Sequence, residues 1–257
     1  MTDDASHFIK RVPAADAARL DAEAAGLAAL RATGAVRVPE VLGRGGDARE
    51  SWLVLERLEL HGLDRASGAA LGHALAQLHR TRGGQFGWSA PNFIGLAPQD
   101  NTPDDSWPLF YGRRRLLPQL LKARSNGLER VYVDKGERLA ERVAAFFVGD
   151  HPAPSLLHGD LWSGNAGRLP DGTPVIFDPA VYYGDREADV AMAELFGGFP
   201  ESFYAAYREA WPLSEGFETR KTLYNLYHIL NHFNLFGAGY LGQAKRMIDR
   251  LSAELRG

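Results

Sequence analysis

Three side chains between residues 158 and 178 have the chemistry needed for phosphoryl transfer. Asp160 and Asn165 lie in the segment His158-Gly159-Asp160-Leu161-Trp162-Ser163-Gly164-Asn165, and Asp178 follows the apolar run Val175-Ile176-Phe177. Transfer of a phosphoryl group to an alcohol requires a carboxylate that orients and deprotonates the hydroxyl, together with oxygen ligands for magnesium. Asp160, Asn165 and Asp178 supply these groups at spacings of five and thirteen residues.

The elements around these residues are predicted to bring them together. Leu156-Leu157 is typical of a short strand leading into the loop 158–165, and two further strands, 166–169 and 174–177, flank the turn 170–172. Because adjacent strands lie about 4.8 Å apart, we expect Asn165 and Asp178 to be close enough to share one magnesium ion. Asp160 then remains free to accept a proton, with His158 bracing the loop. The alternative is a surface turn whose polar side chains only satisfy backbone donors.

A lysine and a glutamate near the N-terminus form a second candidate pair. Lys10 lies in the predicted strand 7–12, and Glu23 shares a helical face with Leu20 and Leu27. A charge on an apolar face is costly unless it is paired. We therefore expect Lys10 and Glu23 to pair, with Lys10 available to nucleotide phosphates. The alternative is that both side chains point to solvent at the edges of their elements.

The remaining pattern predicts an α+β protein with two lobes. Strands are expected at 36–42 and 51–58, and one helix begins after Asp16 and ends near Gly34. From residue 61 onward the periodicity is mainly helical, at 66–79, 111–123, 132–148 and from 188 to the end, with Pro118 expected to kink the second of these. We predict a small antiparallel-sheet lobe over residues 1–60 and a larger helical lobe over residues 61–257.

Composition excludes several classes of function. The chain has 257 residues, a formal net charge of −3 and no cysteine. This charge argues against nucleic-acid binding, and no apolar run reaches the roughly 20 residues of a membrane span. The first ten residues lack the apolar core of a secretory signal. We expect a cytoplasmic protein with no nucleic-acid or membrane partner, and the sequence carries no signal for an oligomeric state.

Taken together, these residues resemble the fructosamine kinases, or ketosamine 3-kinases, which are relatives of aminoglycoside and choline phosphotransferases with a protein-kinase-like fold. The generic loop is H-x-D-x-x-x-x-N, and Trp162 within it is what points to this family. Further matching pieces are Asn92-Phe93-Ile94-Gly95, Pro98-Gln99-Asp100-Asn101, Trp107-Pro108, Asp178-Pro179-Ala180, Tyr183-Gly184, Phe196-Gly197-Gly198-Phe199-Pro200 and Leu230-Asn231-His232-Phe233-Asn234. The resemblance covers nearly the whole chain.

The resemblance implies ATP- and Mg²⁺-dependent phosphorylation of the sugar 3-hydroxyl of ketosamines, either small molecules or glycated proteins. By position, Asp160 would be the base, and Asn165 and Asp178 the magnesium ligands. The nucleotide would be bound by Lys10, oriented by Glu23, and by the hinge from Glu56 to Leu58. Trp162 would lie against the sugar, or alternatively pack beneath the loop.

One departure from the family pattern concerns the nucleotide lid. Only nine residues precede Lys10, which is too few for two strands of about five residues and a turn. We therefore expect the Gly-rich hairpin to be missing or shortened, and the small lobe to be reduced. Two alternative functions stay open. One is a kinase for another alcohol, such as an aminoglycoside or choline. The other, which the short lead before Lys10 supports, is a nucleotide-binding protein with impaired activity.

Several polar residues have no assigned role in this scheme. Asp185 and Glu187 are interpreted as charges that complement a helix dipole, and Asp189 as a further brace for the catalytic loop. Arg113-Arg114-Arg115 is interpreted as a solvated face. Gln99, Asn101 and Trp107 would either contact substrate or order their loop.

Overall fold

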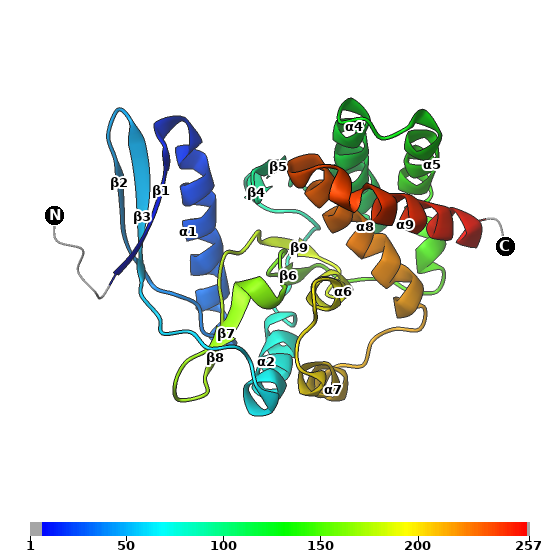
Figure 1. Cartoon of the computed structure of the whole chain (residues 1–257). Coiled ribbons are helices and arrows are strands. Elements are labelled where there is room, and N and C mark those ends of the chain that lie inside the picture. The colour runs from blue at the N-terminus through cyan, green and yellow to red at the C-terminus, as the bar shows by residue number, and fades with distance from the viewer. Residues whose placement is uncertain (1–6, 256–257) are drawn as a thin grey trace.

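A three-stranded antiparallel sheet covered by one helix forms the N-terminal lobe. The computed structural model describes residues 7–255, and the strands follow the order β1-β3-β2 (Figure 1). Their bounds are β1 His7–Pro13, β2 Val41–Gly46 and β3 Glu50–Glu56, and the covering helix is α1, Ala17–Ala32. Leu27 and Leu30 of α1 are fully buried against the sheet, as is Leu53 of β3. This apolar contact fixes the face of α1 that carries Glu23.

Most of the predicted elements in this lobe are confirmed. Gly34 follows α1 with φ +63°, a left-handed conformation suited to a helix end. Asp16 directly precedes α1, but its side chain makes no capping hydrogen bond because a 3₁₀ turn, Ala14–Asp16, leads into the helix. The second strand begins at residue 41 and not at residue 36. The segment before it is used differently, since Arg37 bridges to Val175 of the other lobe.

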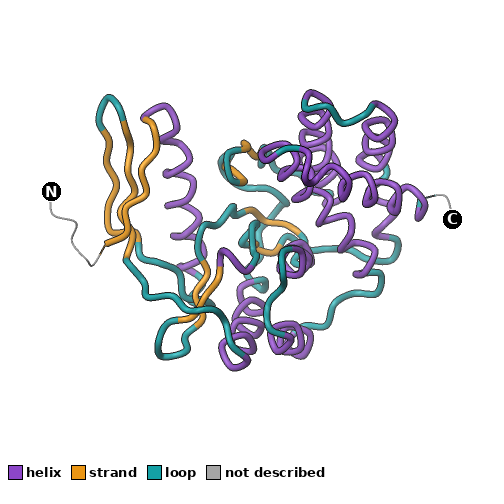
Figure 2. The backbone as a smooth tube through the Cα atoms, in the orientation of Figure 1, coloured by secondary structure: helices purple, strands orange, loops and turns teal. Residues whose placement is uncertain are grey.

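The C-terminal lobe is mainly helical, as expected (Figure 2). Its helices are α2 Arg65–Leu78, α3 Trp107–Tyr111, α4 Leu117–Ser125, α5 Arg130–Glu141, α6 Glu187–Leu195, α7 Glu201–Ala210, α8 Phe217–Phe236 and α9 Leu241–Glu254. Helix α8 runs through the centre of this lobe and packs against α4, α6 and α9. Almost all of its residues between Thr222 and Asn231 are buried. A scaffold of this kind holds the loops at its edge in fixed positions.

Three short two-stranded ribbons lie where the lobes meet. They pair β4 Asn92–Ile94 with β5 Ala97–Gln99, β6 Ser155–Leu157 with β9 Tyr182–Gly184, and β7 Ala166–Arg168 with β8 Pro174–Ile176. The β7-β8 hairpin confirms the one predicted from sequence. It also contacts the N-terminal lobe and the linker, because Arg37 bridges to Val175 and His61 to Arg168. The segment after β8 therefore lies beside α1.

The helix predicted over residues 111–123 is interrupted before its proline. A π-helical turn, η2 (Gly112–Leu116), joins α3 to α4, and Pro118 falls in the first turn of α4. Because proline cannot donate to the preceding turn, a wider turn ahead of it accommodates the missing hydrogen bond. The helix predicted over 132–148 ends at Glu141 and continues as a 3₁₀ turn, Val143–Phe147.

Two further sequence-based expectations concern the segment before Lys10 and membrane-spanning helices. The expected absence of a Gly-rich hairpin before Lys10 falls largely on residues 1–6, which lie outside the described residues. Between residues 7 and 255, no helix combines the length and the apolar character needed to cross a bilayer.

Candidate active site

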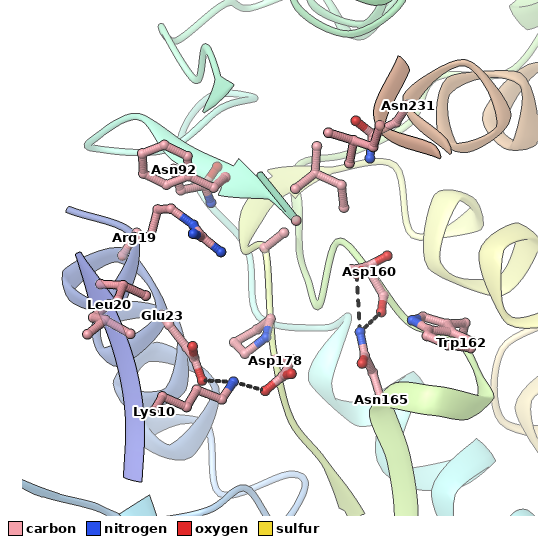
Figure 3. Close-up of a pocket in the computed structure, with 18 of the residues that line it drawn as sticks. Lys10, Arg19, Leu20, Glu23, Asn92, Asp160, Trp162, Asn165, Asp178 and Asn231 are labelled. Carbon is pink, nitrogen blue, oxygen red and sulfur yellow. Dashed lines mark hydrogen bonds and ion pairs between the residues drawn. The ribbon is translucent and has the colours of Figure 1, made fainter. Parts of the chain in front are cut away.

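Lys10 joins the two lobes through two carboxylates. It lies on β1 opposite Leu53 of β3, and its Nζ donates to Glu23 Oε1 of α1 at 2.7 Å. The same ammonium also contacts Asp178, which follows β8 (Figure 3). Burial favours the neutral amine, but the two carboxylates outweigh it and raise the pKa of Lys10. The predicted Lys10–Glu23 pair is therefore present, and Asp178 extends it.

Asp160 and Asn165 face each other across the loop that follows β6. The Asn165 amide donates one hydrogen bond to the Asp160 carbonyl at 2.9 Å and another to Asp160 Oδ2 at 3.1 Å. Both amide hydrogens are thus used, which leaves Asn165 Oδ1 as an acceptor without a donor among the described residues. Asp178 contacts Lys10 through Oδ1 and has Oδ2 remaining. These two oxygen atoms suit a hard cation such as magnesium.

The residues of the site fit magnesium only if water and substrate phosphates supply the remaining oxygen ligands. Within residues 7–255, no group of three or more His, Asp or Glu side chains could hold a metal ion. Magnesium commonly takes one or two protein carboxylates or amides and completes its shell with water and substrate phosphates. Asn165 Oδ1 and Asp178 Oδ2 match that arrangement.

The environment of Asp160 changes its acidity. Burial raises the pKa of its carboxyl to about 7, and the negative charges of Asp178 and Asp189 act in the same direction, while the Asn165 amide opposes them. A carboxylate with a pKa near the working pH can accept a proton from an alcohol and release it again. Asp160 therefore has the acidity of a general base.

The loop around Asp160 is fixed from beneath by buried partners. Asp189 of α6 accepts hydrogen bonds from the backbone N–H of His158 at 2.7 Å and of Gly159 at 2.9 Å. His79, at the end of α2, contacts Asp189 at 3.2 Å and the Tyr207 hydroxyl at 2.8 Å. Asp189 is almost completely buried. These bonds confirm the expected brace by Asp189 and add His79, which the sequence analysis did not identify.

His158 connects the Asp160 loop to the strand that ends at Asp178. Its Nε2 lies 3.0 Å from the Phe177 carbonyl, and its Nδ1 lies 3.3 Å from the Asp160 N–H. Burial lowers the pKa of His158, so the neutral ring can donate through Nε2 and accept through Nδ1. The bracing role predicted for His158 is confirmed.

Two residues here have left-handed backbone conformations. Gly159 has φ +83°, and a Cβ on it would lie 2.1 Å from the Ala180 carbonyl oxygen. Asp178 has φ +57° and is the one non-glycine residue with positive φ in the described part of the chain. Aspartate tolerates this conformation better than most residues. The resulting turn after β8 brings the Asp178 carboxylate to Lys10.

A cleft of about 470 Å³ contains the predicted catalytic residues. Lys10, Glu23 and Asp178 line one end, and Asp160, Asn165 and Trp162 line the wall formed by the C-terminal lobe (Figure 3). The indole of Trp162 is half-buried and meets Phe196 edge-on, with ring centroids 6.0 Å apart. Trp162 thus packs against a neighbour and also lines the cleft, and its contact with a sugar stays a prediction.

A second, smaller pocket of about 270 Å³ lies on the other side of Lys10. Leu58 and Glu56 line it together with Phe8, Leu55 and Phe177. The Glu56 carboxylate is paired with Arg37 at 2.6 Å, which leaves a mainly apolar wall for a flat ring. Lys10 and Asp178 line both pockets. These two residues therefore lie where the two pockets adjoin.

A buried polar network, largely missed by sequence reasoning, supports the β4-β5 edge of the cleft. The interpretation of Arg115 as solvated is wrong: its side chain is fully buried in η2. Its guanidinium lies 4.1 Å from the ring centroid of Tyr182 and donates to Asn101 Oδ1 at 2.6 Å. Asn101 in turn donates to Asn92 Oδ1 at 2.8 Å. The sequence carried one signal of this burial, since Arg115 follows the buried Tyr111 at the helical spacing of four residues.

Asp185 and Glu187 lie at the start of α6, as the helix-dipole interpretation expects, and Asp185 accepts from the Glu187 N–H at 3.0 Å, but both also have long-range partners. Both side chains are buried. Glu187 accepts from Arg220 Nε at 2.7 Å, and Asp185 accepts from the Tyr224 hydroxyl. These contacts tie the start of α6 to α8. Short-range patterns do not reveal such partners because they lie more than thirty residues away in the chain.

A family model and several known proteins match almost the entire chain. The family model described as Fructosamine kinase matches residues 1–254. A probable ketoamine kinase of Synechocystis sp. is 47% identical over 250 residues, covering 95% of this chain and 82% of the relative. A chloroplastic protein-ribulosamine 3-kinase of Arabidopsis thaliana is 42% identical over 256 residues, covering 96% and 76%.

Solved structures give the same result for the fold. The crystal structure named "Putative fructosamine-3-kinase" from Haemophilus somnus superposes with a TM-score of 0.89 at 32% identity, covering 95% of this chain and 83% of that one. An aminoglycoside 2'-phosphotransferase, at 11% identity and a TM-score of 0.62, shares the fold alone. The predicted two-lobed, protein-kinase-like α+β fold is confirmed.

Proposed function

The chain belongs to the fructosamine kinase family, and on that premise we propose that it transfers the γ-phosphoryl group of ATP to the sugar 3-hydroxyl of ketosamines. The chain is an ATP-dependent kinase, in keeping with its named relatives. The observation that carries the proposal is that Lys10, Asp178, Asp160 and Asn165 meet around one cleft. No other described pocket combines a paired lysine with an unpaired amide oxygen and a carboxyl of raised pKa.

In the proposed reaction the nucleotide occupies both pockets. Its base would lie between Leu58 and Phe177, and its phosphates would reach Lys10, whose ammonium Glu23 holds in place. Magnesium, held by Asn165 Oδ1 and Asp178 Oδ2, would neutralise charge on the β- and γ-phosphates. Asp178 and Lys10 are already in contact, so the phosphates would meet a preformed pair of opposite charges.

Asp160 acts on the acceptor. The substrate hydroxyl donates to the Asp160 carboxylate, and its oxygen forms a bond to the γ-phosphorus. The bond from that phosphorus to the bridging oxygen breaks, ADP leaves with that oxygen, and the hydroxyl proton moves to Asp160. The Asn165 amide holds the carboxylate in position through the bond at 3.1 Å. Trp162 borders the same wall and offers a flat surface to a sugar ring.

The lining of the cleft favours a ketosamine over the alternative acceptors. Its described acidic residues are Glu23, Asp160 and Asp178, and all three belong to the proposed phosphate and base machinery. A polycationic aminoglycoside would need further carboxylates. A quaternary ammonium such as choline would need an uninterrupted aromatic cage, whereas Arg19 carries a positive charge on the α1 side. Small ketosamines or glycated proteins are therefore the proposed substrates.

The test is steady-state ATP turnover with a panel of acceptors. We expect phosphorylation of ribulosamine or fructosamine acceptors, no turnover of kanamycin or choline, and loss of activity when EDTA removes magnesium. Asp160→Ala should abolish turnover. Equal turnover by that variant would contradict the role of Asp160, and a preference for kanamycin or choline would contradict the acceptor class.

A further inference from the structure

One cationic side chain in the cleft has no role in the proposed reaction. Arg19 lies on α1 one turn before Glu23 and lines the larger cleft. Its side chain is only 28% exposed, and the nearest carboxylate oxygen, Asp16 Oδ2, lies 3.9 Å away. Its Nε is buried and has no hydrogen-bond partner. A buried donor without a partner is energetically unfavourable, so a bound ligand that supplies an acceptor would gain affinity by satisfying it.

Apart from Asp16, at 3.9 Å, no carboxylate among the described residues forms an ion pair with Arg19. Its guanidinium lies beside Asn92 and points into the cleft, toward the wall that carries Asp160 (Figure 3). Asn92 is fully engaged, because its amide donates to the Val181 carbonyl at 2.7 Å and its oxygen accepts from both Gln99 and Asn101. Arg11 also lines the cleft, but its guanidinium is paired with Glu50 and lies 5.8 Å from the Trp52 ring centroid.

The position of Arg19 favours a contact with the acceptor over a contact with the nucleotide. Lys10 and Asp178 line both pockets, whereas Arg19 lines only the larger one. Four residues separate it from Glu23, which corresponds to a rise of about 6 Å along the helix, and the Arg19 guanidinium lies beside Asn92, whereas Lys10 lies beside Glu23 and Asp178. A planar guanidinium with several N–H donors is suited to binding a carboxylate through two parallel hydrogen bonds.

We propose that Arg19 binds a carboxylate of the acceptor, so that the preferred substrates are ketosamines of free amino acids, whose carboxylate lies close to the glycated amine. This inference rests on the proposed ketosamine kinase function. The sugar 3-hydroxyl would reach Asp160 while the carboxylate reaches Arg19 across the cleft. A ketosamine formed on a lysine side chain within a protein lacks an adjacent carboxylate and would leave Arg19 unsatisfied.

The experiment compares two matched acceptors, N-ribulosyl-glycine and its neutral amide, N-ribulosyl-glycinamide. Because hydrogen bonds to a charged group contribute about 1.5–3 kcal/mol, we expect the wild-type protein to favour the carboxylate by roughly ten- to hundredfold in kcat/KM. Arg19→Gln should bring this ratio close to one. Arg11→Gln is the matched control, and it should retain the wild-type ratio.

The outcomes separate this inference from the proposed function. Phosphorylation of neither acceptor would contradict the function itself. Equal kcat/KM for both acceptors in the wild type would overturn the inference and leave the function standing. An equal loss on both acceptors in Arg19→Gln, with a raised KM for ATP, would also overturn it by assigning Arg19 to the nucleotide. If Arg19→Gln does not fold, Arg19→Lys, which keeps the charge without the planar fork, should show a reduced ratio. An unchanged ratio in Arg19→Lys would count against the inference.

Discussion

At the scale of single residues, the chemistry of the site depends on where each charge is buried. Asp160 is surrounded closely enough for burial to raise the pKa of its carboxyl to about 7. The Asp178 side chain is 45% exposed and is paired with Lys10. The two carboxylates are thereby suited to different tasks. Asp160 can exchange a proton near neutral pH, and Asp178 lies in contact with the Lys10 ammonium.

The raised pKa of Asp160 predicts a measurable effect on stability. The folded protein holds this proton at a higher pH than the unfolded chain, whose pKa is near 3.8. Stability from this group is therefore present below pH 4 and is lost as the pH rises from about 4 to about 7. Asp160→Asn does not titrate, so we expect it to be more stable than the wild type at pH 8 by about 1–3 kcal/mol.

Urea unfolding at pH 4 and pH 8 checks this prediction. The gain in Asp160→Asn should be present at pH 8 and absent at pH 4, and Asp249→Asn, which removes a partly exposed ion pair with Lys135, serves as the control. The same variant should lose about 10²–10⁴-fold in kcat, as expected for removal of a general base. A variant that is less stable than the wild type at pH 8 would contradict the assignment of a buried, charged Asp160.

The raised pKa of Asp160 also predicts how kcat/KM depends on pH. The unprotonated form of Asp160 is the one that accepts the hydroxyl proton, so kcat/KM of the wild type should rise with pH and level off above a pKa of about 7 in the free protein. Measurement of kcat/KM from pH 5.5 to 9 gives this value directly. A profile that is flat across that range would be inconsistent with Asp160 as the base.

At the scale of elements, the catalytic loop is held by its backbone. Asp189 of α6 binds the N–H groups of His158 and Gly159, and the Ala180 N–H donates to the His158 carbonyl at 2.8 Å. Such close approach leaves no room for a side chain on Gly159. The loop geometry therefore depends on a glycine at this position for two reasons, its left-handed φ and the proximity of the Ala180 carbonyl.

A pair of glycine substitutions can separate these two reasons. Gly172, in the β7-β8 turn, has φ +90° and no atom within 4 Å of its ideal Cβ position. Gly172→Ala should therefore cost only the conformational term, about 1–2 kcal/mol, and leave turnover intact. Gly159→Ala adds a clash at 2.1 Å with the Ala180 oxygen. We expect it to cost at least about 3 kcal/mol, or to shift the loop and reduce kcat by more than tenfold.

Thermal unfolding and turnover, measured on Gly159→Ala and Gly172→Ala, show whether the Ala180 contact adds to the effect of the left-handed φ. Equal losses of stability in the two variants, with unchanged turnover in both, would show that the contact between Gly159 and Ala180 does not restrict the loop.

At the scale of the whole molecule, the site exists only where the two lobes meet. Lys10 and Glu23 come from the N-terminal lobe, and the other candidate site residues come from the hairpin region between β6 and β9. Gly26 of α1 packs against Pro179, with 3.1 Å between its ideal Cβ position and the proline Cγ, and one apolar core runs through both lobes. The division into residues 1–60 and 61–257 remains a prediction.

A nucleotide that contacts both lobes should stabilise the molecule as a whole. By mass action, Mg-ATP at 100 times its dissociation constant adds about 2.7 kcal/mol to the free energy of unfolding. Lys10→Ala removes the proposed phosphate contact, so we expect a clearly smaller rise in Tm at the same concentration. Arg44→Ala, which breaks an exposed ion pair with Asp21 in the same lobe, is the matched control. An identical ATP-induced rise in Tm in the Lys10 and Arg44 variants would argue against Lys10 as a phosphate ligand.

Local spacing in the sequence was sufficient to predict the candidate site residues that meet in the cleft and most of the elements that carry them. Asp160, Asn165 and Asp178 are close along the chain, a short hairpin joins them, and the helical period places Glu23 on the apolar face of α1. Such features depend on neighbours within a few residues, so the sequence alone determines them. It also determined the family, because the motifs extend over almost the whole chain.

Only the tertiary structure decided which polar residues are buried and what they contact. Arg115 is the last of three consecutive arginines, yet its burial over Tyr182 depends on packing across 67 residues of chain. The same holds for Glu187 with Arg220, for His79 with Asp189, and for the unpartnered Nε of Arg19 in the cleft. Burial and long-range pairing set the pKa of Asp160 and the shape of the acceptor site, because both depend on distances in space that no local pattern encodes.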